Sequence, residues 1–327
     1  MLLTLLLALA PQPVDVTATP FPNDLSGPAG CTVFRTGYIL KGDKEFGGIS
    51  AMRFDGDEAT LVADDALLYR GTLTRNQAGF VTGFSDLVRW PLTDENGKRL
   101  SKSRGDSEGL VLESGGALIS LERQHRISRF TPEENGWAER YRLHTDDRDI
   151  LETNSGFEAL AELKDGRLVS FSEGVDDDGL GLVIFLTRDD GEWVPSDAQY
   201  RPAADFRVTD AATDPETGDL FVLERAFSRL RGPRARLVRV AAPDLYEGQV
   251  IEGEELVRLS TLDGVDNMEG LTVERRDDGR LLAHIISDDN YNALQRTVLM
   301  GFEIDEDCSL PAIAGDGRGA GMKPDPQ

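Results

Sequence analysis

Short apolar runs separated by glycine turns recur along the chain. In each repeat an acidic residue and a small residue open a hydrophobic stretch, a glycine turn follows, and a second β-rich stretch ends on acids or arginine. The second copy covers residues 108–112, turns at Gly115, and returns over 118–121 to end on Glu122. No segment keeps the period of about 3.6 residues that marks a helix, so the pattern predicts antiparallel hairpins.

This unit occurs five times. The copies open near residue 48, at Glu108, at Glu158, at Asp210 and at Glu269, and most are followed by a third β-like run. Short antiparallel strands repeated radially predict an all-β protein, a β-propeller with five recognisable blade repeats and five or six blades. A β-sandwich is the alternative fold, although a sandwich does not require so regular a repeat.

Two cysteines, Cys31 and Cys308, lie near the two ends of the chain. Their spacing suits a disulfide that ties the ends of a closed ring, with the segment 31–40 as an outer strand of the last blade. Two unrelated buried thiols are the alternative, because the sequence does not show whether the two Cα atoms come within bonding range.

The N-terminal segment has the features of a secretory signal. Residues 2–10 are apolar but too few to span a bilayer, and Val16 and Ala18 allow cleavage before Thr19, with cleavage after Ala10 as a second option. A periplasmic or secreted protein without stable membrane insertion after cleavage is expected. The predicted organisation is a signal peptide at 1–18, a single propeller domain at 19–310 and a flexible C-terminal tail at 311–327.

The chain is strongly acidic, with 59 Asp and Glu against 35 Lys and Arg and a net charge of −24. Such a field attracts cations and repels polyanions, so nucleic acid is not an expected partner. The exception is a run of five arginines between residues 229 and 239, interrupted by Gly232 and Pro233. We interpret this run as a solvated hairpin, with an anion-binding loop as the alternative. The protein is expected to be a monomer.

Carboxylates recur where the repeats begin and end. In a hairpin the start of the first strand and the end of the second lie at the same end, so these acids should meet at the mouth of the channel. Converging carboxylates stay ionised only if a cation compensates them, and oxygen-only ligands suit Ca²⁺. The alternative is that the acids cap strands and pair with arginines. One expected circle contains Glu108, Glu158, Asp210 and Glu269, and the other contains Asp64, Glu122, Glu173, Glu224 and Asp288, with Arg123 and Arg225 beside it.

Other catalytic signatures are missing from the sequence. There is no Gly-x-Ser-x-Gly elbow, no His-Glu-x-x-His helix and no phosphate-binding loop of the P-loop type. Three histidines disfavour zinc sites and Ser-His-Asp triads. His284 stands within an apolar run and is interpreted as a packed strand residue rather than a general base.

Several motifs together resemble the phytase-like family of bacterial exported proteins, described by an "esterase-like activity of phytase". The resemblance covers roughly residues 30 to 306. Two departures from the repeated motif are Ala159, where glycine is expected after the acid, and Asp210, where the Glu-Gly pair is missing. The motifs are Phe46-Gly47-Gly48-Ile49-Ser50, Gly105-Asp106-Ser107-Glu108-Gly109-Leu110, Asn154-Ser155-Gly156-Phe157-Glu158-Ala159-Leu160, Asn267-Met268-Glu269-Gly270-Leu271, Ser287-Asp288-Asp289-Asn290 and Gln295-Arg296-Thr297.

The chain also resembles, more weakly, the calcium-dependent lactonase propellers of the gluconolactonase and paraoxonase type. Together the resemblances imply calcium-dependent hydrolysis of a small ester or phosphoester at the channel mouth. A non-catalytic periplasmic propeller that binds a ligand or a protein is the alternative. The implied roles are Glu108 and Glu269 as principal metal ligands, Glu158 and Asp210 as further ligands, Asp288 as general base, and Arg123 and Arg225 as holders of an anionic group.

Overall fold

The computed structural model describes residues 11–21, 27–43, 46–145 and 156–308, which form five blades of mainly antiparallel strands around a central channel. The innermost strands are β5 (Ile49–Asp55), β9 (Ser107–Glu113), β13 (Phe157–Glu162), β17 (Arg207–Thr213) and β22 (Asn267–Arg275). Each contacts the next, and β22 contacts β5, so the ring is closed. The predicted β-propeller is confirmed, and it has five blades.

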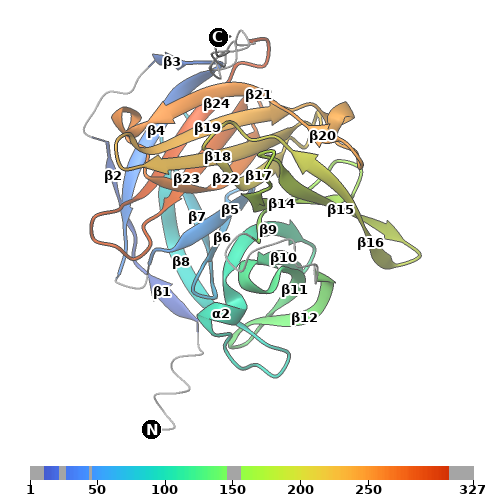
Figure 1. Ribbon diagram of the computed structural model, residues 1–327. Helices are drawn as coiled ribbons and strands as arrows, with labels where there is room; N and C mark the ends of the chain where they lie inside the picture. The colour runs from blue at the N-terminus through green and yellow to red at the C-terminus, as the bar shows by residue number, and fades with distance from the viewer. Residues whose placement is uncertain (1–10, 22–26, 44–45, 146–155, 309–327) are drawn as a thin grey trace, which may run out of the picture.

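Blades one and two are joined through a short parallel pairing of β12 with β8. In Figure 1 the curled strands of blade two lie in the lower part of the molecule. Blade one continues from β5 with β6 (Glu58–Ala63), β7 (Leu67–Arg75) and β8 (Val81–Thr93). Blade two continues from β9 with β10 (Gly116–Leu121), β11 (Arg126–Glu133) and β12 (Gly136–Thr145), and it is preceded by the one-turn helix α2 (Lys102–Gly105).

Blades three, four and five follow in chain order, and blades four and five occupy the upper part of Figure 1. Blade three continues from β13 with β14 (Leu168–Val175), β15 (Gly181–Asp189), β16 (Glu192–Tyr200) and the two-residue β20 (Val250–Ile251). Blade four continues from β17 with β18 (Leu220–Ser228), β19 (Gly232–Val240) and β21 (Glu254–Ser260). Blade five continues from β22 with β23 (Leu281–Asp288) and β24 (Thr297–Ile304).

The apolar core is divided among the interfaces between blades. The described residues form five buried clusters, and each combines side chains of two neighbouring blades. Between blades five and one, for example, Ile286 and Leu299 pack with Ile49 and Leu61. Because each blade buries its faces only against its neighbours, the ring must close before the first and last blades are covered.

The ring closes through the N-terminal part of the chain. Strand β4 (Thr32–Lys41) pairs with β24 and is the outer strand of blade five, as the sequence predicted. Cys31 and Cys308 form a disulfide with 5.3 Å between their Cα atoms, which confirms the bridge. On the other edge of β4 lie the short strands β2 (Thr17–Pro20) and β3 (Gly27–Ala29).

The described strands before β4 are part of the propeller. Strand β1 (Gln12–Val14) pairs with β8, so cleavage before Thr19 would remove β1 and cut β2, whereas cleavage after Ala10 would keep both. The apolar run 2–10 and the tail 311–327 lie outside the described residues, and both cleavage points stay predictions. Within the described part, none of the helices has the length and apolarity needed to cross a bilayer.

Candidate metal and catalytic site

Each blade has one β-bulge near the start of its inner strand, and four of the five bulge side chains reach the channel mouth. In each inner hairpin the register of the first strand shifts by one residue near its start. A bulge adds an unpaired residue and re-aims its side chain. The unpaired residues are Ser50, Glu108, Glu158, Thr209 and Glu269 in blades one to five.

A second ring is formed where the second strands of the hairpins end. In each blade, the residue just before the bulge pairs with a residue of the second strand, and the residue that follows this partner belongs to the second ring. In four blades this position is acidic, and in blade four it is arginine. The five residues are Asp64, Glu122, Glu173, Arg225 and Asp288.

Nine of these ten positions line a cavity of about 300 Å³ at the mouth, Thr209 being the exception. Among the described residues, the lining contains eight carboxylates and three cations, a formal excess of five negative charges, and no apolar side chain. The structure thus brings together Glu108, Glu158, Glu269, Asp288, Arg123 and Arg225, as predicted. The described residues of the lining are Ser50, Asp64, Lys102, Asp106, Glu108, Glu122, Arg123, Glu158, Glu173, Arg225, Asn267, Glu269, Asp288 and Asn290.

The inner carboxylates have raised pKa values because they are buried close to one another. Burial, reinforced by the charges of neighbouring carboxylates, raises the pKa of Glu108 and Glu158 well above the usual value. Burial also raises the pKa of Glu269 to about 8, although the charge of Arg225 opposes it. For Glu122, burial and the charges of Asp106 and Glu173 raise the pKa to about 7.

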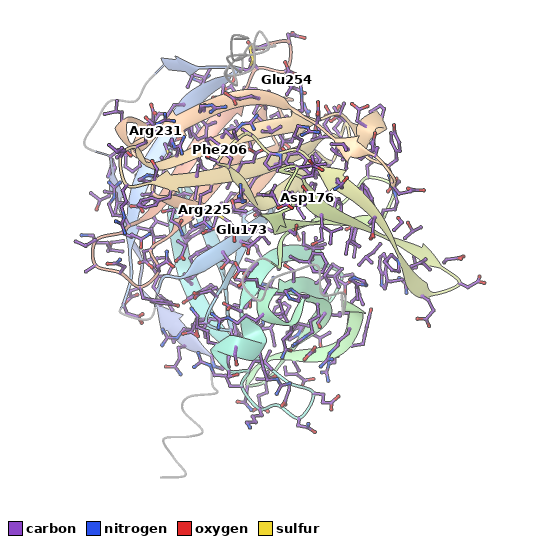
Figure 2. The ribbon with its side chains drawn as sticks, viewed as in Figure 1. Glu173, Asp176, Phe206, Arg225, Arg231 and Glu254 are labelled. Carbon is purple, nitrogen blue, oxygen red and sulfur yellow. A yellow bond between two sulfur atoms is a disulfide. The ribbon has the colours of Figure 1, made fainter. Side chains whose placement is uncertain are left out.

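The three cations of the cavity are already paired. Arg225 contacts Glu173 and Glu269, each at 2.9 Å, and hydrogen-bonds Asn267. Arg225 and Glu173 lie next to each other in Figure 2. The pKa of Arg225 is raised because the carboxylates around it outweigh the effect of burial. Arg123 donates to Asp106, and Lys102 on α2 donates to Asp64. Each cation of the described lining therefore already neutralises at least one carboxylate.

Asp288 occupies the blade-five position of the second ring. Its Oδ1 accepts a hydrogen bond of 2.7 Å from the backbone N–H of Asn290, which has a positive φ of 48°. Burial raises the pKa of Asp288 to about 7; the hydrogen bond from the Asn290 N–H opposes this rise, and the charge of Asp64 adds a smaller contribution to it. The carboxyl group can therefore take up and release a proton near neutral pH.

Two groups of carboxylates could each hold a metal ion, and they share Glu122. One contains Asp106, Glu108 and Glu122, and the other contains Glu122, Glu158 and Glu173. Within each group one oxygen per residue lies within 4.8 Å of the others. The side chain of Asp64 is 15% exposed. Its Oδ1 atom is buried and has no hydrogen-bond partner among the described residues. The mouth therefore has the donors that a hard cation requires.

Asp210 lies outside this cavity. It follows the bulge residue Thr209, and it occupies the position held by Gly109, Ala159 and Gly270 in other blades. Its carboxylate is fully buried and binds the guanidinium of Arg53 through two contacts of 2.8 and 2.9 Å. The structure thus places Asp210 in an internal ion pair rather than among the predicted metal ligands.

Arg53 closes the channel below the mouth. Besides Asp210 it donates to the backbone carbonyls of Met52, Leu160, Ala211 and Leu271, which come from blades one, three, four and five. One guanidinium thus joins four blades at the axis. The pair Arg53–Asp210 forms the floor that separates the mouth cavity from the opposite end.

Glu224 is also displaced from the predicted circle. It is completely buried within blade four, where it accepts hydrogen bonds of 2.6 Å from Tyr200 and 2.8 Å from Arg236. The next residue, Arg225, takes the place at the mouth. His284 is buried 3.0 Å from Glu274 and beside Phe54, which agrees with its interpretation as a packed strand residue.

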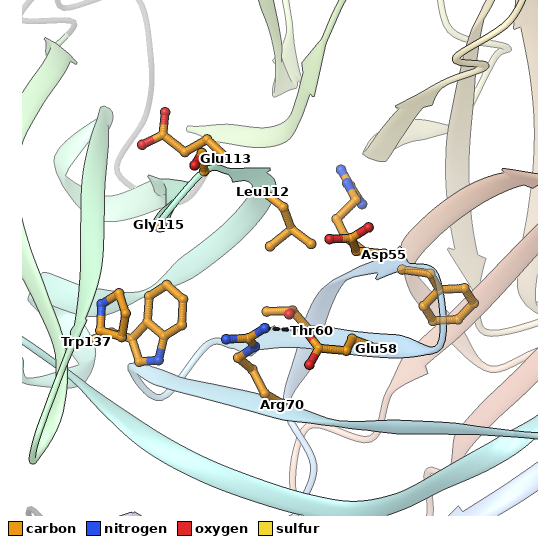
Figure 3. A pocket seen from close by; sticks show the side chains of 13 residues that line it. Asp55, Glu58, Thr60, Arg70, Leu112, Glu113, Gly115 and Trp137 are labelled. Atoms are coloured by element: carbon orange, nitrogen blue, oxygen red, sulfur yellow. Dashed lines mark hydrogen bonds and ion pairs between the residues drawn. The ribbon is translucent and has the colours of Figure 1, made fainter.

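A second pocket lies at the turn end of the hairpins, between blades one and two. Its volume is about 570 Å³, and Arg53 is part of its wall. Figure 3 shows Asp55 and Glu58 with Arg70, which pairs with Glu58, and Trp137 on the opposite side. This pocket mixes both charges with apolar side chains, unlike the mouth cavity.

Ser50, Lys102 and Asp106 line the mouth but were not among the residues chosen from the sequence. Asp106 could have been found from its place in the Gly105-Asp106-Ser107-Glu108 motif. Ser50 carries no charge to mark it. Lys102 reaches the cavity from α2, outside the repeat, so no periodic signal identifies it.

A family model described as "Phytase-like: Esterase-like activity of phytase" matches residues 44–291. The chain belongs to the Phytase-like family. The resemblance inferred from the motifs is confirmed, and the match includes every residue that lines the mouth cavity. A comparison with curated proteins found no match.

Solved structures that match this Phytase-like chain have low sequence identity to it. The glutaminyl cyclase of Myxococcus xanthus is 11% identical, with 85% of this chain and 99% of that chain covered and a TM-score of 0.46. The PQQ-bound aldose sugar dehydrogenase of Streptomyces coelicolor is 11% identical, with 88% of this chain and 99% of that chain covered and a TM-score of 0.44. A putative 6-phosphogluconolactonase of Bacteroides uniformis is 12% identical, with 87% of this chain and 80% of that chain covered and a TM-score of 0.38. Similarity at this level carries no information about activity.

Proposed function

We propose that the mouth cavity binds a divalent cation, with Ca²⁺ as the best fit, and hydrolyses a small ester or phosphoester there. The observation that carries this proposal is the excess of five negative charges in a cavity of about 300 Å³ whose three cations are all paired. Such an excess requires either protons or a bound cation. The oxygen-only donor set favours a hard cation.

The proposed ligands come from both rings. Glu108, Glu158 and Glu269 are presented by the bulges, and Glu122, shared by both candidate groups, replaces Asp210. Six to eight oxygens are typical of Ca²⁺, and Asn267 could supply a further one. The unpartnered Oδ1 of Asp64 supports a ligand beside this set.

A bound cation would polarise a carbonyl or phosphoryl oxygen and lower the pKa of a coordinated water. Asp288 is the proposed proton acceptor, since it lines the cavity and the Asn290 N–H holds its carboxylate in place. An anionic group at Arg123 or Arg225 would compete with the carboxylates that these arginines already neutralise, Asp106 for Arg123 and Glu173 and Glu269 for Arg225. We therefore favour a neutral or singly charged ester over a polyanion such as phytate.

The paired arginines also support a second candidate function. A cavity whose positive charges are all neutralised can bind a cation without engaging an anionic substrate, so a non-catalytic cation-binding propeller is the alternative. For either function we propose export to the periplasm or the medium. The disulfide is consistent with such a compartment.

The proposal is tested by calorimetric titration of the purified protein with Ca²⁺. Wild type is compared with Glu108→Gln/Glu269→Gln, followed by a screen of ester and phosphoester substrates. The matched control is Glu58→Gln/Glu113→Gln, which removes two carboxylates of the opposite pocket. We expect Ca²⁺ binding in wild type and control, and none in the mouth variant.

Absence of Ca²⁺ binding in wild type would overturn the metal site. Binding without turnover of any ester would leave the cation-binding propeller as the better account. Turnover that survives in the mouth variant would place the chemistry elsewhere. Circular dichroism of each variant checks that the fold is retained, since the substituted side chains keep nearly the same volume.

A further inference from the structure

The most exposed apolar side chains of the described chain lie on three segments of blades four and five. Leu230 is 97% exposed, Leu294 91%, Leu262 87% and Phe227 71%, whereas no other large apolar residue in the described ranges exceeds 50%. Single exposed apolar residues are ordinary on protein surfaces, but a group of them marks an interaction site. We call the segments 227–231, 261–264 and 290–296 together the apolar rim.

The three segments of the apolar rim are in contact. Thr261 in the 3₁₀ turn η3 (Thr261–Asp263) donates to the carbonyls of Arg231 and Pro233, both at 3.3 Å, at the tip of the β18–β19 hairpin. On the other side of η3, Arg296 donates to the carbonyl of Gly264 at 3.3 Å. The rim is thus a continuous strip across two blades rather than three separate loops.

The apolar rim is positive in a strongly negative protein. Arg229 and Arg231 are exposed on either side of Leu230, and Arg231 is labelled near the edge of the molecule in Figure 2. Asp263 is the one carboxylate of the rim. It is half-buried and accepts two hydrogen bonds of 2.8 Å from the backbone N–H and the side chain of Ser260. No exposed residue of the described rim therefore carries a negative charge.

The apolar rim stands beside the mouth cavity. Each segment follows or precedes a cavity residue along the chain: Arg225 comes before Phe227, Asn267 comes after Gly264, and Asn290 opens the third segment. A surface that engages the rim would therefore approach the open side of the cavity.

We propose that the apolar rim docks this protein on the surface of an anionic lipid bilayer. Exposed leucine and phenylalanine side chains enter the boundary between headgroups and acyl chains, and flanking arginines are attracted to anionic headgroups. Both features coincide at the rim, and elsewhere the net charge of −24 opposes such contact. The docked protein would hold its mouth cavity toward the lipid, so lipid-derived esters would be within reach.

Flotation of the purified protein with vesicles tests this inference. One set contains equal parts of phosphatidylglycerol and phosphatidylcholine, and the other contains phosphatidylcholine alone. Wild type should float with the anionic vesicles at low salt and bind the neutral ones far more weakly. Leu230→Ser/Leu262→Ser should weaken the binding roughly tenfold or more, and Arg229→Ser/Arg231→Ser roughly 30-fold.

The matched control is Tyr141→Ser/Val194→Ser, which removes two apolar residues, 48% and 47% exposed, outside the rim. It should float like wild type. The inference is overturned if wild type ignores anionic vesicles, if it binds both lipids equally, or if the rim variants bind like the control. Sedimentation velocity adds one further outcome: self-association that depends on Leu230 and Leu262, without vesicle binding, would assign the rim to a second copy of the chain.

Discussion

Blades two and four share one backbone plan but give opposite charges to the mouth cavity. At the two ring positions blade two has Glu108 and Glu122, whereas blade four has Thr209 and Arg225. Blade four also contributes Asp210, which binds Arg53 in the channel floor. In a repeat architecture, one blade can thus diverge. Blade four supplies the carboxylate of the channel floor and the positive charge of Arg225, whereas the other blades supply the carboxylates of the mouth.

The largest expected loss of stability comes from removing the carboxylate that blade four contributes to the channel floor. Asp210→Asn leaves Arg53 buried without its carboxylate partner, so the free energy of unfolding should fall by about 3 to 5 kcal/mol. Urea denaturation measures this loss. Glu113→Gln is the control, since its pair with Arg129 is partly exposed and should be worth at most about 1 kcal/mol. An equal loss in the free energy of unfolding of both variants would show that the Arg53–Asp210 pair does not hold the blades together.

The second effect concerns the carboxylates supplied by the other blades. Glu122, Glu269 and Asp288 have folded-state pKa values of about 7, 8 and 7, above their ordinary values. Between the ordinary and the raised pKa values the folded state binds more protons than the unfolded state, so stability falls as pH rises. In a chelator the midpoint of thermal unfolding should therefore be lower at pH 8 than at pH 5.

Calcium should reverse this loss. At a concentration about 100 times its Kd it should add about 2.7 kcal/mol to the free energy of unfolding at pH 8, with less gain at pH 5. Glu108→Gln/Glu269→Gln should show a weaker pH dependence and no gain from calcium. A midpoint in chelator that rises from pH 5 to pH 8 would contradict the raised pKa values.

The smallest expected effect sharpens the role of the blade-four cation. Arg225→Gln frees Glu173 and Glu269 from their ion pairs, so calorimetry should show Ca²⁺ binding roughly tenfold tighter, or about 1.4 kcal/mol. Arg201→Gln, which breaks an exposed pair with Glu252, serves as the control and should leave the affinity unchanged. Weaker binding in the Arg225 variant would mean that the guanidinium positions the ligands instead of competing with the cation.

The sequence was sufficient to predict the propeller, its closure and most of the mouth residues, because each of these repeats with the hairpin or lies near a chain end. It was insufficient in blade four. Aligning Glu224-Arg225 with Glu122-Arg123 placed Glu224 at the mouth, but the register of β17 and β18 places Arg225 there. The error is one residue, and it moves a side chain from one face of the sheet to the other.

The turn glycines contain the missing signal. Glu122, Glu173 and Arg225 each stand seven residues after a glycine with positive φ, namely Gly115, Gly166 and Gly218. Such a φ is readily adopted by glycine, and in these three blades the count from the turn identifies the residue at the mouth. In blades one and five the count is different, eight residues from Gly56 to Asp64 and nine from Gly279 to Asp288. The bulges cannot be counted in this way, because the first strands differ in length, and Ser50 and Thr209 carry no charge that would mark the mouth.

The strand order of blade five has a consequence for biosynthesis. Strand β4 is completed early and pairs locally with β2 and β3, but its other edge pairs with β24, close to a disulfide that joins residues 277 positions apart. Contacts so distant in the sequence form late and slowly. Until residue 304 has been synthesised, β4 presents an open edge to which another unfinished copy can add a strand. Nascent copies are therefore exposed to strand exchange until the last blade is complete.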